Sequence, residues 1–340
     1  MVFEQLKLKE TAQLLVRDEP TFAVLLLIFG ALSLGRIIYQ NLYVLLQTFV
    51  LPGYSLKRYG ANKGAWAVVT GATDGIGKEF AFQLGKAGFN ILLVARNKDL
   101  LTQTAAEIET KYKVSTATHS IDFANANDAG YEALGRAFTG LDIGVLVNNV
   151  GKSHAMPAYL VDIPKDEIKD IVSININATI SVTYTVLPLM IKKKRGLILN
   201  IGSFSGAVPS PMLAPYSGTK AFLATFSDAL GEEVAQYNIT VEHVNTYFVV
   251  SKLSKIRKAS LLIPKPGPYV RSVLGKIGMA CGASYSGKAN TSTPYWSHSL
   301  LNWLITSIGV PSLFIKYTHG LHKDIRRRAL AKAARESKSQ

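Results

Sequence analysis

Residues 65–77, AWAVVTGATDGIG, decide the fold of this 340-residue chain. The first six of them form an uncharged apolar run, which is typical of a strand buried on both faces of a parallel sheet. Glycines follow at once, and residues 75–86 then place apolar side chains at helical spacing. A buried strand, a glycine turn and a helix in this order predict the opening unit of an α/β domain.

Strands and helices continue to alternate downstream of this unit. Apolar runs predict strands at about 90–95, 115–120, 145–148, 196–201 and 240–245, and helical spacing predicts helices at about 98–112, 127–139, 165–193 and 216–237. This alternation indicates a Rossmann-type, doubly wound parallel sheet with helices on both faces. We expect this domain over residues 61–255, between an N-terminal region, residues 1–60, and a C-terminal extension, residues 256–340.

The composition indicates a folded chain that contacts a membrane. Hydrophobic residues make up 48% and charged residues 18% of the sequence, and the mean hydropathy is +0.17. These values exclude a disordered or fibrous protein. The single cysteine, Cys281, excludes a disulfide framework. Neither it nor the six histidines show metal-ligand spacing, so we expect no metal.

The net charge of +15 is concentrated in the last third of the chain. Residues 243–340 hold 16 Lys and Arg against 2 Asp and Glu, and no acid lies between Glu242 and Asp324. A basic surface indicates an anionic partner, which is nucleic acid, a phosphorylated ligand or acidic lipid. The basic third carries no nucleic-acid-binding motif, so we do not expect nucleic acid.

An apolar N-terminal segment indicates a membrane anchor. Residues 21–34 and 37–51 are uncharged, and Arg36 lies between them. Acidic residues before the segment argue against a cleaved signal peptide. We expect an anchor helix at about residues 21–40, with Arg36 reaching towards an interface. A buried helix of a soluble domain is the alternative, and residues 37–51 are free to span, re-enter or lie along the surface.

The glycine turn predicts a dinucleotide site. Gly71, Gly75 and Gly77 allow amides at a helix N-terminus to face a pyrophosphate, although a tight packing turn is the alternative. An acid at the end of the second strand would favour NAD. Arg96 stands there instead, and Lys78 follows the last glycine, so we expect NADP(H). A merely solvated Arg96 is the alternative.

Four polar residues suit the reduction of a carbonyl group. Tyr216 and Lys220 are four residues apart and share one helical face. We expect this ammonium, together with a positive nicotinamide, to lower the pKa of the phenol. Ser203, at the end of the fifth predicted strand, can hydrogen-bond an oxygen that becomes an alkoxide. Asn175 is placed to orient Lys220 through water.

In order and spacing these motifs, with Asn148 and Asn149, resemble the short-chain dehydrogenase/reductases over residues 64–255. The resemblance implies a Ser203–Tyr216–Lys220 triad supported by Asn175, with the tyrosine as proton donor. An Asp122 near the adenine is also implied, although a helix cap or turn is the alternative there. The implied cofactor contacts are Gly71, Asp74, Gly75, Ile76, Gly77, Arg96, Asp122, Asn148, Asn149, Tyr216, Lys220, Val249 and Ser251.

More narrowly, the chain is similar to the membrane-bound 3-ketoacyl-CoA reductases of very-long-chain fatty acid elongation, above all the fungal ones. Where the wider family commonly has Pro-Gly after strand six, residues 245–251 read NTYFVVS. Val150, the tripeptide 202–204 and residues 293–296 (TPYW) add to the likeness. It implies NADPH-dependent reduction of 3-oxoacyl-CoA at the endoplasmic reticulum membrane, with the catalytic domain facing the cytosol and other elongation enzymes as partners.

This similarity suggests a function for the basic residues 243–340, because coenzyme A carries several negative charges. We expect four cations to attract its phosphates, although a solvated loop facing anionic lipid is the alternative: Lys252, Lys255, Arg257 and Lys258. Residues 300–315 suit either a membrane-dipping wall of an acyl tunnel or a plain core or lid helix. Residues 319–340 predict a basic helix in the cytosol or along the membrane.

Two rival functions stay open. The same triad reduces any ketone that the pocket admits, so a 17-beta-hydroxysteroid or 3-ketosteroid reductase is the nearest alternative. A basic rim fits a CoA ester better than an uncharged steroid. A non-catalytic scaffold of an elongation complex would be expected to have lost Ser203, Tyr216 or Lys220, and all three are present.

Overall fold

The computed structural model describes residues 10–11, 13–14 and 17–338. Its contacts divide the chain into two units, residues 1–46 and 47–340. The apolar N-terminal segment forms a single helix, α2 (Pro20–Phe49), and Gly35 and Arg36 do not interrupt it. The helix therefore extends beyond the predicted anchor at residues 21–40.

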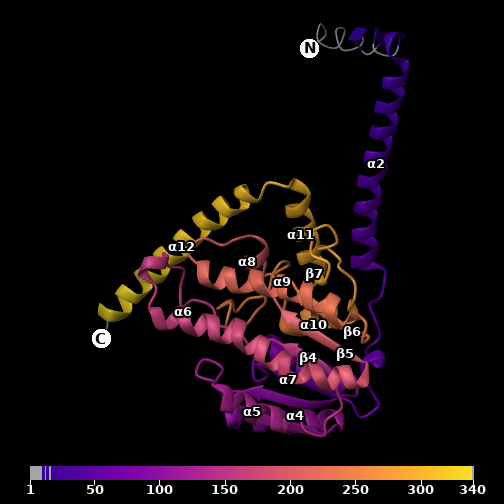
Figure 1. Cartoon of the computed structure of the whole chain (residues 1–340). Helices are drawn as coiled ribbons and strands as arrows, with labels where there is room; N and C mark the ends of the chain where they lie inside the picture. Colours follow the sequence, from indigo (N-terminus) through magenta and orange to yellow (C-terminus); the bar gives the residue numbers. More distant parts are fainter. Residues whose placement is uncertain (1–9, 12, 15–16, 339–340) are drawn as a thin grey trace. The chain divides into compact units, whose positions relative to one another are not determined.

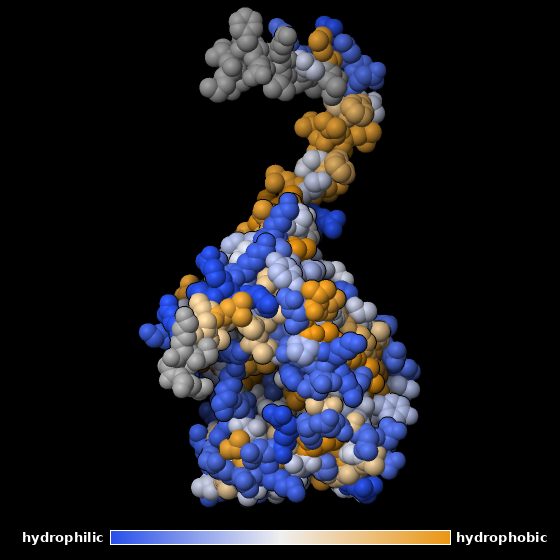
Figure 2. Space-filling view, turned by 90° about the vertical axis from the view of Figure 1, so that its left-hand side faces the viewer, coloured by the Kyte–Doolittle hydropathy of each residue, from blue (hydrophilic) through white to orange (hydrophobic). Residues whose placement is uncertain are grey.

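Helix α2 exposes its large apolar side chains. Phe29 and Leu32 are 72% and 69% exposed, and Figure 2 shows hydrophobic surface along most of the helix. Thirty residues at about 1.5 Å each exceed the roughly 30 Å of a bilayer core. The helix is therefore a candidate membrane span. Only 6% of its apolar window is buried, which argues against the alternative of a buried helix.

The second unit is built on a seven-stranded parallel sheet of order β3-β2-β1-β4-β5-β6-β7. Each strand predicted from the sequence is present within two residues of its expected bounds. The last strand, β7, was not predicted, because two polar residues leave no apolar run. The strands are β1 (Trp66–Thr70), β2 (Asn90–Ala95), β3 (Thr116–Ser120), β4 (Ile143–Asn148), β5 (Gly196–Ile201), β6 (Ile239–Val244) and β7 (Thr291–Ser292).

Helices cover both faces of this sheet and enclose one apolar cluster on each (Figure 1). The first cluster packs α3 (Gly75–Lys86), α4 (Lys98–Tyr112) and α10 (Pro266–Gly275) on the sheet. The second packs α5 (Asp128–Ala137), α7 (Ala178–Lys193) and α9 (Ala214–Ala235). The doubly wound α/β fold is confirmed.

The predicted helix over residues 165–193 consists of three parts. Helix α6 (Lys165–Val172) leads into one π-helical turn, η3 (Ser173–Asn177), and then directly into α7. This stretch is also long and apolar enough to span a membrane, but 39% of its apolar window is buried. Ile174, Val182 and Met190 lie in the second apolar cluster, which identifies the stretch as a core helix.

The C-terminal extension completes the sheet and then forms two helices. It supplies α10 and β7, followed by α11 (Trp296–Ile308) and α12 (Pro311–Lys338). The predicted basic helix of the tail is present. The apolar residues 300–315 are divided between α11 and α12 at Gly309, whose φ is +66°. Three short helices complete the fold: η1 (Leu56–Tyr59), η2 (Leu160–Asp162) and α8 (Phe204–Ala207).

Candidate active site

The glycine turn lies where the strand order reverses, between the neighbouring strands β1 and β4. Gly71 and Gly75 have φ values of +67° and +54°, which favour glycine. Asp74 caps α3, because its Oδ1 accepts the Gly75 N–H at 2.9 Å. A Cβ on Gly77 would overlap the carbonyl oxygen of Gly71. The turn is therefore a cradle that larger residues would fill, as a bound pyrophosphate requires.

Asn149 fastens this turn to β4. Its Nδ2 donates to the carbonyl oxygens of Thr70 at 3.0 Å and Gly71 at 3.3 Å, and its N–H donates to Thr70 Oγ1 at 3.0 Å. Ser251 approaches from the loop after β6, where its Cβ would lie 3.4 Å from a Cβ built on Gly75. The loop with Val249 and Ser251 thus lies against the glycine turn, as the implied cofactor contacts require.

Asn148 acts inside the sheet. It is 4% exposed, and its Nδ2 donates to Thr183 Oγ1 of α7 at 2.9 Å and to Asn200 Oδ1 of β5 at 2.8 Å. Asn200 in turn donates to Ser227 Oγ of α9 at 2.9 Å. This buried chain of hydrogen bonds connects β4 and β5 with α7 and with α9, the helix that carries Tyr216 and Lys220.

The residues expected near the adenosine lie at the ends of β2 and β3. Arg96 is exposed directly after β2. Lys78 forms an ion pair with Glu107 at 2.9 Å, which partly offsets its charge. Asp122 supports a turn, since its carboxylate accepts the Ala124 N–H at 3.3 Å and Asn125 Nδ2 at 2.9 Å. Asp122 is not a helix cap; Asn127 caps α5 instead.

Ser203, Tyr216 and Lys220 meet at the carboxyl end of β5. Ser203 caps α8, and its side chain hydrogen-bonds the buried Tyr216. Lys220 is one turn further along α9, with its Nζ 5.9 Å from the centroid of the Tyr216 ring. That Nζ also donates to the carbonyl oxygen of Ile201 at 2.8 Å. The structure therefore brings together the three residues of the implied triad.

Burial is the main influence on the pKa values of this triad. Burial raises the pKa of Tyr216, and the hydrogen bond with Ser203 opposes it. Burial therefore opposes the lowering of this pKa that Lys220 and a positive nicotinamide are expected to produce. Burial also lowers the pKa of Lys220 to about 8. A lysine with this pKa is mostly charged at neutral pH and can still exchange a proton.

Asn175 lies on the π-helical turn η3, a geometry that is frequent at functional sites. Its Oδ1 accepts the Lys152 N–H at 2.8 Å, while its Nδ2 donates to the Lys152 carbonyl oxygen at 3.0 Å and to Thr219 Oγ1 at 2.9 Å. A Cβ built on Gly151 would lie 3.5 Å from Asn175 Oδ1 and 3.7 Å from Lys220 Nζ. Asn175 and Lys220 thus approach the same point.

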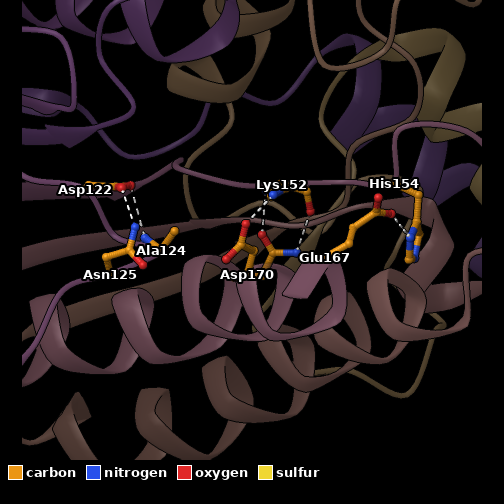
Figure 3. A network of polar contacts seen from close by, with 8 residues as sticks. Asp122, Ala124, Asn125, Lys152, His154, Glu167 and Asp170 are labelled. Atoms are coloured by element: carbon orange, nitrogen blue, oxygen red, sulfur yellow. Dashed lines mark hydrogen bonds and ion pairs between the residues drawn. The ribbon is translucent and has the colours of Figure 1, made fainter. Parts of the chain in front are cut away.

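Sequence reasoning missed the residues that hold Asn175. Lys152 binds it through the main chain, and Lys152 Nζ forms an ion pair with Asp170 of α6 at 2.5 Å. His154 Nδ1 lies 2.7 Å from Glu167 Oε1, also on α6, and Figure 3 shows both pairs along this helix. Hydrogen bonds of the main chain do not depend on side-chain type, so they cannot be inferred from a sequence. Only the charged residues within 165–170 could have indicated the ion pairs of this network.

Asn175→Ala is expected to lower kcat and to reduce the free energy of unfolding by about 2 kcal/mol, because buried partners on Lys152 and Thr219 lose their hydrogen bonds. The KM for the cofactor should change little. Steady-state kinetics and chemical denaturation measure these effects. Asn177→Ala, on the exposed side of the same turn, is the control. Equal losses of kcat and of unfolding free energy in both variants would contradict a specific role of the Asn175 side chain in holding the site.

Three of the four predicted coenzyme A contacts line a common cavity. The cavity has a volume of about 740 Å³ and is lined by Val250, Ser251, Lys252, Lys255, Ile256, Arg257 and Lys332. Lys258 is not among these residues, and Lys332 of α12, which was not predicted, is. Lys255 Nζ donates to the Ala155 carbonyl oxygen, and Lys252 Nζ lies 3.4 Å from Asp74 Oδ2. The cavity therefore adjoins the glycine turn.

Curated relatives match nearly the whole chain. The very-long-chain 3-oxoacyl-CoA reductase of Coprinopsis cinerea is 69% identical over 98% of this chain and 99% of its own length. The protein of the same name from Laccaria bicolor is 69% identical over 96% of both chains. The very-long-chain 3-oxoacyl-CoA reductase of Aspergillus fumigatus is 48% identical over 92% of this chain and 91% of its own length.

Solved structures share the fold at lower identity. A 7beta-hydroxysteroid dehydrogenase has a TM-score of 0.66 and 21% identity, covering 77% of this chain and 98% of its own. A short-chain dehydrogenase from Sphingobium yanoikuyae in complex with NADPH has a TM-score of 0.60 and 22% identity, covering 74% and 95%. The model of the short chain dehydrogenase family matches residues 65–260. This chain therefore belongs to the short-chain dehydrogenase family.

Proposed function

We propose that this protein is the NADPH-dependent very-long-chain 3-oxoacyl-CoA reductase that carries out the first reduction of the fatty acid elongation cycle. The observation that carries this proposal is the 69% identity, over almost the full length, to two reductases of that name. The intact and assembled triad of Ser203, Tyr216 and Lys220 supports a catalytic function rather than a scaffold.

The residues around the glycine turn fit a dinucleotide, and NADPH, when bound, supplies the hydride. Gly71, Gly75 and Gly77 would hold its pyrophosphate, and Arg96 would face the 2′-phosphate of the ribose. Arg96 supports NADPH over NADH for two reasons. A guanidinium forms strong hydrogen bonds with a phosphate such as the 2′-phosphate of NADPH. The acidic residue that would bind the 2′-hydroxyl of NADH is absent from this position.

The triad handles the proton and the developing charge on the substrate. Ser203 donates a hydrogen bond to the 3-oxo group and stabilises the alkoxide, and Tyr216 then donates its proton to that oxygen. The nearby Lys220 ammonium stabilises the resulting phenolate. Asn175 holds the Lys152 main chain and approaches the same point as Lys220, so its proposed role is to orient Lys220 through water.

Comparing two substrates tests the function. Purified protein in detergent should oxidise NADPH faster with a long-chain 3-oxoacyl-CoA than with a 17-ketosteroid at the same concentration. Faster turnover of the steroid would overturn the proposed substrate and leave the family unchanged. Binding of NADPH without turnover of either substrate would favour the scaffold.

The cavity beside the glycine turn is the proposed site for the coenzyme A phosphates. Replacing Lys252, Lys255 and Arg257 by glutamine should raise the KM for 3-oxoacyl-CoA by at least roughly 10–100-fold, because the loss of even one hydrogen bond to a charged group costs about 1.5–3 kcal/mol. The KM for NADPH should rise far less. Lys258→Gln, outside the cavity lining, is the control. An equal rise in both KM values would refute this assignment.

A membrane location completes the proposal. Helix α2 is long and apolar enough to anchor the chain, and a very-long-chain acyl group partitions into lipid. We place the protein in the endoplasmic reticulum membrane, with its catalytic domain in the cytosol beside other elongation enzymes. Fractionation of cells that produce the tagged protein, followed by protease protection of the microsomes, tests this location.

A further inference from the structure

Helices α11 and α12 expose a group of large apolar side chains where they meet. Five residues, each 45–71% exposed, form what we term the α11–α12 apolar surface: Leu304, Ile308, Val310, Leu313 and Tyr317. Leu304 and Ile308 lie one turn apart on α11, and Leu313 and Tyr317 lie one turn apart on α12. Soluble proteins rarely leave such groups in contact with water.

Neither helix crosses a membrane through these residues. Helix α11 has 13 residues and is about 20 Å long, which is shorter than a bilayer core. Among the described residues, the stretches long and apolar enough to span are Pro20–Phe49 and Lys165–Lys193. The α11–α12 apolar surface is therefore suited to partial insertion from one side.

The exposed face of α12 changes from apolar to cationic along its length. Leu313 and Tyr317 occupy its first turns, and the exposed cations Lys323, Arg327 and Arg328 follow further along the helix. One acid, Asp324, lies among these cations on the same face as Leu313 and Tyr317, and it pairs with Arg327 at 3.0 Å. An apolar end followed by cations complements a bilayer whose acyl core lies beneath anionic headgroups.

Helix α12 borders the catalytic side of the domain. His322 Nδ1 lies 2.7 Å from the Pro211 carbonyl oxygen, three residues before α9 begins. Arg326 donates to the Pro157 carbonyl oxygen at 3.0 Å and to Asp162 Oδ2 at 3.1 Å. In Figure 1, α12 runs from α11 towards α6. Polar contacts thus hold α12 against the loops beside the triad.

We propose that the α11–α12 apolar surface inserts into the acyl region of an anionic bilayer, with the cationic part of α12 resting on the headgroups. This contact is separate from α2 and goes beyond the proposed function. It would place the catalytic side of the domain directly against lipid.

The full-length chain offers a position-specific test. Cys281 is its only cysteine; it is buried, and burial raises the pKa of its thiol to about 12, so it resists alkylation. Leu304→Cys and Leu313→Cys can therefore carry a polarity-sensitive fluorophore selectively. Leu100→Cys on α4, at a leucine that is 41% exposed, is the matched control. Retained NADPH binding verifies that each labelled variant is folded.

The labelled proteins are reconstituted into vesicles of phosphatidylcholine and phosphatidylserine. Because α2 is expected to hold every variant on the vesicle, the readout is the local environment of the label. Labels at 304 and 313 should shift to the blue and lose most of their emission when the acyl chains are brominated, and the label at 100 should not. Replacing Lys316, Lys323 and Arg327 by glutamine should weaken quenching at 313.

Two results would overturn the proposal. One is an emission at 313 that is as water-like, and as insensitive to brominated lipid, as that at 100. The other is a blue shift that depends on the ratio of protein to lipid and not on bromination. That second result would mean that another copy of the chain covers the surface.

Discussion

Tyr216→Phe is expected to lower kcat for a long-chain 3-oxoacyl-CoA by roughly 10²–10⁴-fold, the usual contribution of a general acid. The phenyl ring fills the same buried space, but it has no proton to give to the developing alkoxide. Ser203 keeps its hydroxyl and can still polarise the ketone, which accounts for a residual rate.

Steady-state NADPH oxidation measures this loss, and NADPH fluorescence titration measures cofactor binding. Binding should remain within a few-fold of the unmodified protein, because the substitution removes one hydroxyl at the end of a rigid helix. Tyr184→Phe removes the same group from a side chain that is 80% exposed on α7, and should leave the kinetics unchanged. A Tyr216→Phe enzyme with normal kcat would require a different proton donor.

Gly77→Ala is expected to weaken NADPH binding by about 100-fold, if roughly 3 kcal/mol of overpacking falls on the cofactor turn. The added methyl group would overlap the carbonyl oxygen of Gly71 and the side chain of Asn149. Gly77 does not have a positive φ, so this effect is one of space and not of backbone strain.

Titration of NADPH fluorescence measures the affinity, and chemical denaturation shows how much of the loss is global destabilisation. Gly275→Ala, at the end of α10, is the control, because a Cβ there meets nothing within 4 Å. Unchanged NADPH affinity in Gly77→Ala would show that the cofactor does not use this turn.

The sequence predicted the layers of the fold well because strand burial and helix periodicity are local properties. The bounds of β2, β5, α3 and α4 match the expectation. Strand β7 escaped prediction because it exists only through pairing with β6. Sequence spacing places Lys220 near Tyr216 but does not reveal the extent of burial, which raises the pKa of the phenol.

The proposed catalytic side chains could be singled out from the sequence because they form an ordered set of residue types, and the structure brings them together at the end of β5. The supporting network could not be singled out, since Lys152 acts mainly through its peptide groups and Thr219 through one hydroxyl. Lys332 joined the basic cavity only through the path of α12, about 75 residues beyond its other cations.

The π-helical turn η3 also makes the chain sensitive to length between α6 and α7. Such a turn is equivalent to one residue inserted into a regular helix. Deleting the partly buried Ile176 would let the helix close its ordinary ladder, and would rotate α6 by about 100° relative to α7. Asp170 and Glu167 would then face away from Lys152 and His154. A single-codon deletion here should be more harmful than most substitutions at the same positions.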